Sequence, residues 1–323
     1  MKKILHTAKY TGAPLEILKG ACPEGFTVKT LDELTHEQLV KEAIDADYFL
    51  VSGRLPINQE VLDNAPRLKM IQRTGVGTEM LDVEAIKKRG VPVYVNRGVN
   101  ARSVAEHTIL LILACLRRLP QINQQVHHGV WKKQQTGITT RELKDKTVAI
   151  VGMGNIGRMV AQMLQPFGAK VIYTDVVRLS TEKEQNLRLT FYDNFESLLP
   201  KADILSFHCP LTPDDKEMLN SRTISMMKKG AIVVNTARGK LINPQDLYES
   251  LTTGQLSAAA LDTHFEEPIT DDYNLSELDN VILTPHIGGL SYEAFQSMII
   301  GAMKNIDAFD KGLYENIAIA KYI

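Results

Sequence analysis

The sequence predicts an α/β protein of about two domains, each built on a parallel β-sheet. The chain has 323 residues, which is enough for two domains of roughly 100–200 residues each. Short apolar runs that are typical of strands alternate with helical runs through the first third of the chain, and the alternation begins again near residue 147. Such alternation is typical of parallel sheets with crossover helices.

The first third of the chain is predicted to hold five strands. They start with Ile4-Leu5 and continue at residues 26–28, 48–51, 68–71 and 91–95, with helices predicted at 35–44 and 82–89. The segment from Ser103 to Leu119 then has a continuous helical pattern, and it is apolar nearly all round between residues 109 and 116. Such a helix is expected to lie buried between layers or domains.

The second alternation of strands and helices starts with a strand at Thr147–Val151. Its later strands are predicted at residues 171–173, 204–207, 232–234, 258–261 and 281–283, and a last helix is predicted at about 291–309.

Composition and charge exclude several classes of protein. Lys and Arg number 37 and Asp and Glu 38, so the formal net charge is −1, whereas nucleic-acid-binding proteins usually carry a basic surplus or stripe. The most apolar stretch is well short of the roughly 18 residues that suggest a membrane span, and the N-terminus turns polar too soon for a signal peptide. The three cysteines are too scattered for a disulfide framework or a metal site. We therefore expect a cytoplasmic protein without nucleic-acid, membrane or metal partners.

A glycine-rich segment, Gly152-Met153-Gly154-Asn155-Ile156-Gly157, follows the strand at 147–151 and opens a helix. The next strand ends in an acid, Asp175, 18 residues beyond Gly157, close to the spacing of about 20 in dinucleotide-binding sites. In a dinucleotide site the first glycine permits the turn, the second lets the backbone approach a pyrophosphate, and the third lets the helix pack on the strand. The helix start favours phosphates, and a carboxylate accepts hydrogen bonds from a ribose diol. The segment therefore predicts an NAD site.

Three alternatives stay open for this segment. It could be an ordinary glycine-rich turn beside a surface aspartate. It could bind the adenosyl cofactor of a methyltransferase. Arg178, close to Asp175 in the sequence, leaves room for NADP in place of NAD.

Three ionisable residues follow strands in the second half, where ligands bind in open α/β sheets. Arg238 follows the strand at 232–234, and Glu267 and His286 follow the next two predicted strands. A histidine can donate and recover the proton of an alcohol oxygen, and a nearby carboxylate stabilises its imidazolium form. A guanidinium can polarise a keto oxygen and hold a carboxylate by paired hydrogen bonds. Singly, each could be a surface charge or a structural residue; together they favour a ketone–alcohol interconversion by hydride transfer.

These motifs resemble the D-isomer-specific 2-hydroxyacid dehydrogenase family, and they look most like its phosphoglycerate dehydrogenase branch without regulatory domains. The resemblance covers nearly the whole chain. Its further motifs are Gly75-Val76-Gly77, the segment 103–108, Gly129-Val130-Trp131 and the segment 208–212. It implies an NAD-dependent enzyme that interconverts a small 2-keto acid and its D-2-hydroxy acid, of the 3-phosphoglycerate, hydroxypyruvate/glyoxylate or lactate type.

The resemblance also implies roles for individual residues. Arg238 would bind the substrate carboxylate and polarise the carbonyl, and His286 would be the acid/base with Glu267 as its partner. The backbone N–H groups of Val76 and Gly77 would hold the substrate carboxylate, and Asn100 would also contact the substrate. The cofactor contacts would come from Val76, Thr108, Gly152, Gly154, Asn155, Ile156, Gly157, Asp175, Cys209, Pro210, Thr236, Ala237, Arg238, Asp262, His286 and Gly288. Asp262 would lie near the nicotinamide amide.

The same resemblance implies a discontinuous arrangement of domains. Residues 1–99 and 291–323 would form a flavodoxin-like substrate domain, and residues 100–290 a Rossmann-type NAD-binding domain inserted into it. The long helices of the NAD-binding domain would form a homodimer, with Trp131 as a packing or interface anchor and His107 as a structural residue near that interface. The cleft between the domains would close on the substrate.

Several residues depart from the family's pattern. His264 stands in Asp262-Thr263-His264-Phe265, where the family usually has Asp-Val-Phe, and its role is unexplained. Glu79-Met80 replaces a usual Asp-Asn, and Arg97 replaces a usual proline. We hypothesise that at least one of Arg54, Arg73 and Arg97 binds a distal anionic group of the substrate, such as a phosphate or a second carboxylate. The alternative is that all three are surface charges.

A second functional class keeps the same fold. Corepressors that resemble this family retain the Arg/Glu/His set, so the motifs alone leave open an NAD(H)-sensing binding protein. The absence of added tails argues against that alternative. Oxidation of NADH in the presence of 2-keto acids would distinguish the two classes.

Overall fold

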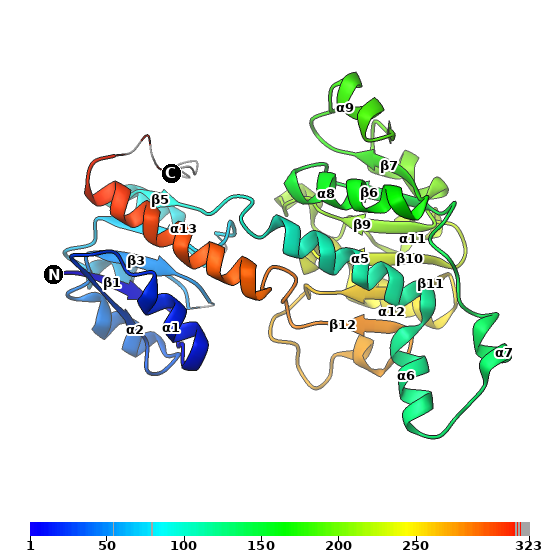
Figure 1. Cartoon of the computed structure of the whole chain (residues 1–323), viewed down its shortest axis with the longest axis horizontal. Coiled ribbons are helices and arrows are strands. Elements are labelled where there is room, and N and C mark those ends of the chain that lie inside the picture. The colour runs from blue at the N-terminus through cyan, green and yellow to red at the C-terminus, as the bar shows by residue number, and fades with distance from the viewer. Residues whose placement is uncertain (54, 79, 314, 316, 318–323) are drawn as a thin grey trace. The chain divides into compact units, whose positions relative to one another are not determined.

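The computed structural model describes residues 1–53, 55–78, 80–313, 315 and 317, and the chain divides into two compact units (Figure 1). The first unit comprises Met1–Asn100 and Tyr292–Ile323, and the second comprises Ala101–Ser291. Each unit contains one parallel sheet, with five strands in the first and seven in the second. The predicted α/β class with two parallel sheets is confirmed.

The sheet of the first unit has the strand order β2-β1-β3-β4-β5. This is the flavodoxin-like order of a doubly wound sheet. Its strands are β1 (Lys2–His6), β2 (Phe26–Thr30), β3 (Tyr48–Val51), β4 (Met70–Arg73) and β5 (Val93–Tyr94). Its helices are α1 (Gly12–Gly20), α2 (His36–Ala43), α3 (Gln59–Asp63), α4 (Val83–Arg89) and α13 (Tyr292–Asp310).

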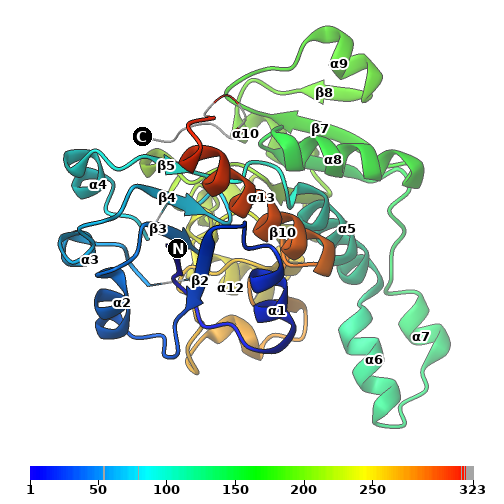
Figure 2. The same cartoon turned by 60° about the vertical axis from the view of Figure 1, so that its left-hand side comes forward.

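The strand β3 shows why this sheet is covered on both faces. All four of its residues are buried, as expected for a central parallel strand. Because successive side chains point to opposite faces, Phe49 and Val51 join the cluster of α2, α3 and α4. Tyr48 and Leu50 join the cluster of α1 and α13. Figure 2 shows α1 and α13 side by side, away from α2, α3 and α4.

The sheet of the second unit has the strand order β12-β11-β10-β9-β6-β7-β8. This is the Rossmann order, extended by one strand. Its strands are β6 (Thr147–Val151), β7 (Lys170–Thr174), β8 (Leu189–Phe191), β9 (Ile204–Phe207), β10 (Ala231–Asn235), β11 (Leu256–Leu261) and β12 (Val281–Leu283). Its α-helices are α5 (Ala101–Arg117), α6 (Leu119–His127), α7 (Lys133–Gly137), α8 (Asn155–Leu164), α9 (Thr181–Asn186), α10 (Phe195–Leu198), α11 (Ser221–Ser225) and α12 (Pro244–Thr252).

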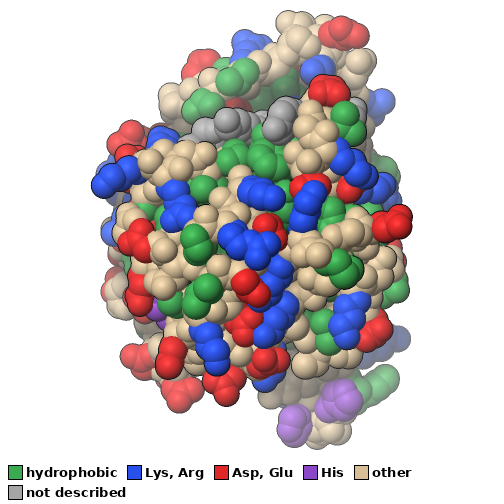
Figure 3. All heavy atoms as spheres, turned by 90° about the vertical axis from the view of Figure 1, so that its left-hand side faces the viewer, with side chains coloured by type: hydrophobic (Ala, Val, Ile, Leu, Met, Phe, Trp, Pro, Cys, Tyr) green, Lys and Arg blue, Asp and Glu red, His purple; other side chains and the backbone are tan. Residues whose placement is uncertain are grey.

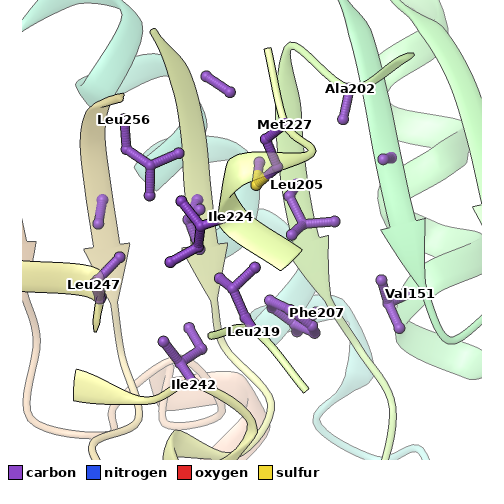
Figure 4. Close-up of a cluster of buried hydrophobic side chains, with 14 of the residues drawn as sticks. Val151, Ala202, Leu205, Phe207, Leu219, Ile224, Met227, Ile242, Leu247 and Leu256 are labelled. Carbon is purple, nitrogen blue, oxygen red and sulfur yellow. The ribbon is translucent and has the colours of Figure 1, made fainter. Parts of the chain in front are cut away.

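Two apolar clusters hold helices against the two faces of this sheet. Leu205 and Phe207 of β9 pack with residues of α10, α11 and α12 on one face. Figure 4 shows both side chains close to Leu219, Ile224 and Met227. Ile204 points the other way, into the cluster formed with α5 and α8. The carboxyl ends of the strands therefore form one well-supported edge of the sheet.

Several local predictions were inaccurate. The helix predicted over 103–119 ends at Arg117, because Arg118 adopts a left-handed backbone with φ of 51°. Its apolar stretch is not covered all round, since the Leu110 side chain is 55% exposed. No range was predicted for helices α1, α3, α6, α7 and α9 to α12 or for the edge strand β8. Strand β8 is only three residues long, so its sequence shows little of the alternation that predicts a strand.

Charged side chains of both signs intermix on the face of the molecule seen in Figure 3. In the first unit, the buried Asp47 carboxylate accepts two hydrogen bonds from Arg67 and one from the backbone N–H of Lys3.

No helix in the described part of the chain has both the length and the apolarity needed to cross a bilayer.

Candidate active site

The glycine-rich turn joins β6 to α8 and is shaped by the protein's own packing. Gly152 has φ of +95°, and a Cβ there would lie 2.6 Å from the backbone nitrogen of Cys209. A Cβ at Gly157 would lie 2.1 Å from the Gly152 carbonyl oxygen. A Cβ at Gly154 would meet no described heavy atom within 4 Å. The first and third glycines are therefore required by the fold, whereas the second faces open space.

This open space suits the pyrophosphate of a dinucleotide. Gly154 is the N-cap of α8, and among the described residues no side chain caps this helix. The first-turn N–H groups therefore stay available to phosphate oxygens. The Cys209 thiol beside the turn is an unsuitable nucleophile, because burial and the charges of Asp215 and Asp175 raise its pKa to about 12.

Asp175 lies directly after β7, where an adenosine ribose would be recognised. Its Oδ2 accepts the N–H of Met153 at 2.5 Å, and its Oδ1 accepts the N–H of Val177 at 2.9 Å. The carboxylate is half-buried, so it both orders the glycine-rich turn and remains accessible. A negative charge here favours a ribose diol over a 2′-phosphate.

The neighbouring Arg178 is already engaged within the second unit. Its Nε and Nη2 donate to the two carboxylate oxygens of Glu184 at 2.9 and 3.0 Å. Its guanidinium carbon lies 4.9 Å from the centre of the Phe191 ring. Hydrogen bonds from Arg178 and Tyr173 lower the pKa of Glu184, so this pair stays charged. The contacts of Arg178 therefore weaken the case for a 2′-phosphate.

The predicted catalytic residues follow three neighbouring strands, β10, β11 and β12. Glu267 and His286 are in direct contact, since Nδ1 of His286 lies 2.9 Å from Oε2 and 3.2 Å from Oε1 of Glu267. A carboxylate can only accept, so Nδ1 carries the proton. The other ring nitrogen, Nε2, is then left for a reacting oxygen. The His286 side chain is 47% exposed and Glu267 21%.

Arg238 sits on a turn that is braced by Asn235, the last residue of β10. The fully buried Asn235 side chain donates to the Arg238 carbonyl at 2.8 Å and accepts from the N–H of Ala237 at 3.0 Å. Arg238 itself donates from Nη1 to the Ala237 carbonyl at 2.8 Å. Sequence reasoning missed Asn235, although its place at a strand end was a usable signal.

Asp262, the residue after β11, anchors the loop that carries His286. Its carboxylate accepts from the Thr284 hydroxyl at 2.6 Å and from the N–H groups of Ile287 and Gly288 at 2.9 and 2.8 Å. Burial alone would raise the pKa of Asp262, but these bonds and one from His107 lower it to about 2. A Cβ at Gly288 would lie 2.9 Å from Asp262 Oδ2, so this loop requires a glycine there.

Of two further residues in this network, Thr284 escaped the sequence analysis, and His107 was expected only as a structural residue near the dimer interface. Nε2 of His107, on α5, lies 3.5 Å from Asp262 Oδ1 and 3.2 Å from the Thr284 hydroxyl. Thr284 directly follows β12, which could have marked it. His107 carried no such signal, because its neighbours come from strands far along the chain.

Thr108 and Thr236, both predicted cofactor contacts, bond to each other. Their hydroxyl oxygens are 2.9 Å apart, and Thr108 is fully buried. The structure therefore places Thr108 behind Thr236, where its hydroxyl supports the turn after β10.

The predicted substrate contacts of the first unit lie at the end of β4, as Arg73 does, or on the loops that follow the strands. Arg73 donates from Nε to the Gly77 carbonyl at 2.7 Å, which ties down the turn at Gly75-Val76-Gly77. Val76 is 46% exposed. Arg97 is exposed, and within the described part of the chain no hydrogen bond or ion pair engages its side chain. Asn100 is half-buried. Arg54 and Glu79 lie outside the described residues.

Comparison with known proteins is consistent with this geometry. The sequence profile of the D-isomer specific 2-hydroxyacid dehydrogenase NAD binding domain matches residues 109–288. The chain is 37% identical over 295 residues to D-3-phosphoglycerate dehydrogenase of Methanocaldococcus jannaschii, covering 91% of this chain and 55% of that protein. It is 36% identical over 280 residues to glyoxylate reductase of Thermofilum pendens, covering 86% and 82%. The chain thus spans about half the length of the first relative and most of the second.

The chain is also similar to solved structures over nearly its whole length. The NAD-dependent formate dehydrogenase of Staphylococcus aureus, solved in complex with NAD, matches with a TM-score of 0.84 at 26% identity. The match covers 99% of each chain.

Proposed function

The chain belongs to the D-isomer-specific 2-hydroxyacid dehydrogenase family, and we propose that it interconverts a small 2-keto acid and its D-2-hydroxy acid with NAD as cofactor. The observation that carries this proposal is the contact between His286 Nδ1 and Glu267 at 2.9 Å. This pair stands at the carboxyl edge of the same sheet whose first turn suits a dinucleotide. In this proposal, proton transfer and cofactor binding would therefore both take place on the second unit.

In the proposed reduction, Nε2 of His286 donates the proton that the keto oxygen gains. Glu267 stabilises the imidazolium and fixes the ring so that Nε2 faces the reacting oxygen. Arg238 holds the substrate carboxylate and polarises the carbonyl. The hydride that the keto carbon gains would come from NADH when it is bound. In the reverse direction, neutral His286 accepts the proton of the alcohol.

Three groups of residues would bind different parts of the cofactor. The turn at Gly152, Gly154, Asn155, Ile156 and Gly157 would bind the pyrophosphate, and Asp175 the adenosine ribose. Cys209, Pro210, Thr236, Ala237, Asp262 and Gly288 would line the remaining part. Thr108 would act through Thr236, as its burial suggests.

The first unit would supply substrate contacts. We propose that the N–H groups of Val76 and Gly77 hold the substrate carboxylate, with Asn100 nearby, and that Arg73 orders this turn. Arg97 is the candidate for binding a distal anionic group, because it is exposed and unengaged among the described residues. The named relatives act on acids that differ in this distal group: 3-phosphoglycerate carries a phosphate and glyoxylate does not.

We further propose a homodimer formed through the second unit. Four apolar side chains of the arm that contains α6 and α7 are exposed: Leu119 (53%), Val126 (49%), Trp131 (80%) and Ile138 (77%). Figure 2 shows this arm extending away from the seven-stranded sheet. Exposed apolar groups gathered on one projecting segment are typical of an interaction surface.

A substrate panel tests the proposed reaction. Purified protein is mixed with NADH and a series of 2-keto acids, and the loss of reduced-nicotinamide absorbance is followed. We expect NADH to be oxidised in the presence of at least one of the 2-keto acids. The relative kcat/KM values then rank the acids as substrates. Binding of NADH without oxidation by any acid would instead support a nucleotide-sensing protein.

A further inference from the structure

His264 is a buried titratable residue to which the mechanism above assigns no role. It is 7% exposed and lies between Asp262 and Glu267 in the sequence. Buried polar side chains are usually held by hydrogen bonds, so its partners show what it supports.

The ring of His264 bonds to the loop that carries the catalytic histidine. Its Nε2 lies 2.9 Å from the Thr284 carbonyl oxygen. Because a carbonyl can only accept, Nε2 is the protonated nitrogen. The same carbonyl accepts the backbone N–H of His286 at 3.0 Å. One oxygen therefore joins the His264 ring to the backbone of His286.

Tyr273 stabilises this orientation of the ring. Its hydroxyl lies 3.4 Å from Nδ1 of His264, and the two rings meet edge to face with centres 5.7 Å apart. Burial and the charge of Glu267 raise the pKa of Tyr273 to about 12, so its hydroxyl keeps its proton. It can donate to Nδ1, which leaves the ring proton on Nε2.

The backbone of His264 contacts the other two catalytic segments. Its N–H donates to Glu267 Oε1 at 2.9 Å, on the carboxylate that pairs with His286. A Cβ at Gly239, the neighbour of Arg238, would lie 1.9 Å from the His264 carbonyl oxygen. All three catalytic segments therefore meet at this residue.

His286 needs such support because of its backbone. Its φ is 58°, a left-handed conformation that residues other than glycine rarely adopt. Such a conformation persists only where the surroundings hold it in place.

We propose that His264 is a positioning residue, whose ring holds the Thr284 carbonyl and thereby keeps His286 in register with Glu267. This inference rests on the proposed function, since it assigns His264 to the acid/base pair of that reaction. His264 touches neither substrate nor cofactor in this account. Its effect is on the placement of the group that moves the proton.

Three variants separate this role from general support of the fold. His264→Phe keeps a ring against Tyr273 but removes the donor to Thr284. His264→Gln places an amide nitrogen close to the position of Nε2 and should therefore restore the hydrogen bond to Thr284 and most of kcat. Thr263→Val is the matched control, because the adjacent Thr263 is 2% exposed and, among the described residues, its hydroxyl has no hydrogen-bond partner. His264→Asn, too short to reach Thr284, replaces the Phe variant if that variant fails to fold.

Kinetics provide the first measurement. His264→Phe should lower kcat about tenfold or more, since small misplacements of a catalytic group can cost up to about 100-fold. The substrate KM and the affinity for NADH should change less than about twofold. His264→Gln should recover most of kcat, and Thr263→Val should match the wild type.

A spectroscopic measurement is independent of activity. At alkaline pH, where imidazole is neutral, the ring ¹⁵N shifts of His286 report which nitrogen holds the proton. The wild type and His264→Gln should show it on Nδ1, facing Glu267, and His264→Phe should show a shift toward the Nε2 form.

The proposal is overturned if His264→Phe leaves both kcat and the His286 tautomer unchanged, or if the Gln variant fails to rescue. It is also overturned if NADH affinity falls as much as kcat. A wild type that oxidises no NADH contradicts the proposed function instead, while the tautomer measurement still decides the positioning role.

Discussion

His286 is the residue on which the proposed chemistry depends most directly. Replacing it with alanine removes the proton donor but leaves the glycine-rich turn and Asp175 intact. We expect kcat to fall by about 10²–10⁴-fold, the usual contribution of general acid–base catalysis, while NADH affinity stays within about twofold.

Steady-state kinetics and fluorescence titration with NADH measure these two effects. His127→Ala, at an exposed histidine of α6, is the control and should retain wild-type values. An equal loss of turnover and cofactor affinity in His286→Ala would count against its role as acid/base.

Arg97 and Arg73 should differ in their effects, although both were candidates for the same role. Removing Arg97 should reduce kcat/KM for 2-keto acids with a second anionic group by about 10–100-fold relative to singly charged ones, the value of a hydrogen bond to a charged group. Removing Arg73 should lower kcat/KM for all 2-keto acids to a similar extent, because Arg73 holds the turn at Gly77. If Arg97→Ala leaves the preference unchanged, Arg97 is a surface charge.

His6 makes the stability of the first unit depend on pH. It is fully buried at the end of β1, and burial lowers its pKa to about 4 from the model-compound value of 6.5. Between these values the unfolded chain binds a proton that the folded chain does not. The free energy of unfolding should therefore fall as pH falls from about 6.5 to 4, in total by about 3 kcal/mol.

Urea unfolding across this pH range measures the effect. His6→Gln should be less stable than the wild type at neutral pH, but its free energy of unfolding should depend less steeply on pH. The exposed control His127→Gln should match the wild type in both respects. Identical pH dependence in His6→Gln and the wild type would rule out His6 as the cause.

Substitutions at two glycines of the glycine-rich turn should have different effects, one on the stability of the protein and the other on cofactor binding. Gly157→Ala places a Cβ 2.1 Å from the Gly152 carbonyl oxygen, so the free energy of unfolding should fall by about 2–4 kcal/mol. Gly154→Ala meets open space and has no unfavourable backbone angle. Its stability should stay within about 0.5 kcal/mol of the wild type, while NADH affinity should fall at least tenfold.

Denaturant unfolding and fluorescence titration of both variants check this separation. The account of the element would be wrong if Gly154→Ala destabilised the protein as much as Gly157→Ala, or if it bound NADH normally.

The elements that sequence could predict are those with strong local patterns. The central strands are apolar throughout, and the turn after β6 needs glycine at two positions for steric reasons, so both are visible in the chain. The pairing of Glu267 with His286 was predictable because adjacent parallel strands end at one edge. The short edge strand β8 and the arm helices α6 and α7 lack such patterns; no residue of either arm helix is buried.

The missed site residues act through tertiary contacts. Asn235 and Thr284 were missed, and His107 was expected only near the dimer interface, because their roles arise only when α5, β10 and β12 are brought together around Asp262. His264 was noticed as an unexpected polar residue, but its partner Thr284 is twenty positions away. Spacing along the chain contains no information on that contact.

At the scale of the whole molecule, the proposed dimer predicts a change in mass. Light scattering after size exclusion should give twice the 36.0 kDa of one chain. Trp131→Ala combined with Ile138→Asp removes two exposed apolar anchors of the arm and should give monomers. The exposed Leu34 of the first unit (58%) provides the control, since Leu34→Asp should remain dimeric. A monomeric wild type, or a dimeric double variant, would contradict the proposal.

The central claim is that this chain transfers a hydride to a 2-keto acid to form the D-product. The most direct measurement uses NADH deuterated at the transferred position with the best acid of the panel, followed by chiral separation and mass analysis of the hydroxy acid. The account predicts one deuterium at carbon 2 of the D-enantiomer, formed about 10²–10⁴-fold more slowly when His286 is replaced by alanine. An unlabelled product, or deuterium in the L-enantiomer, would contradict it.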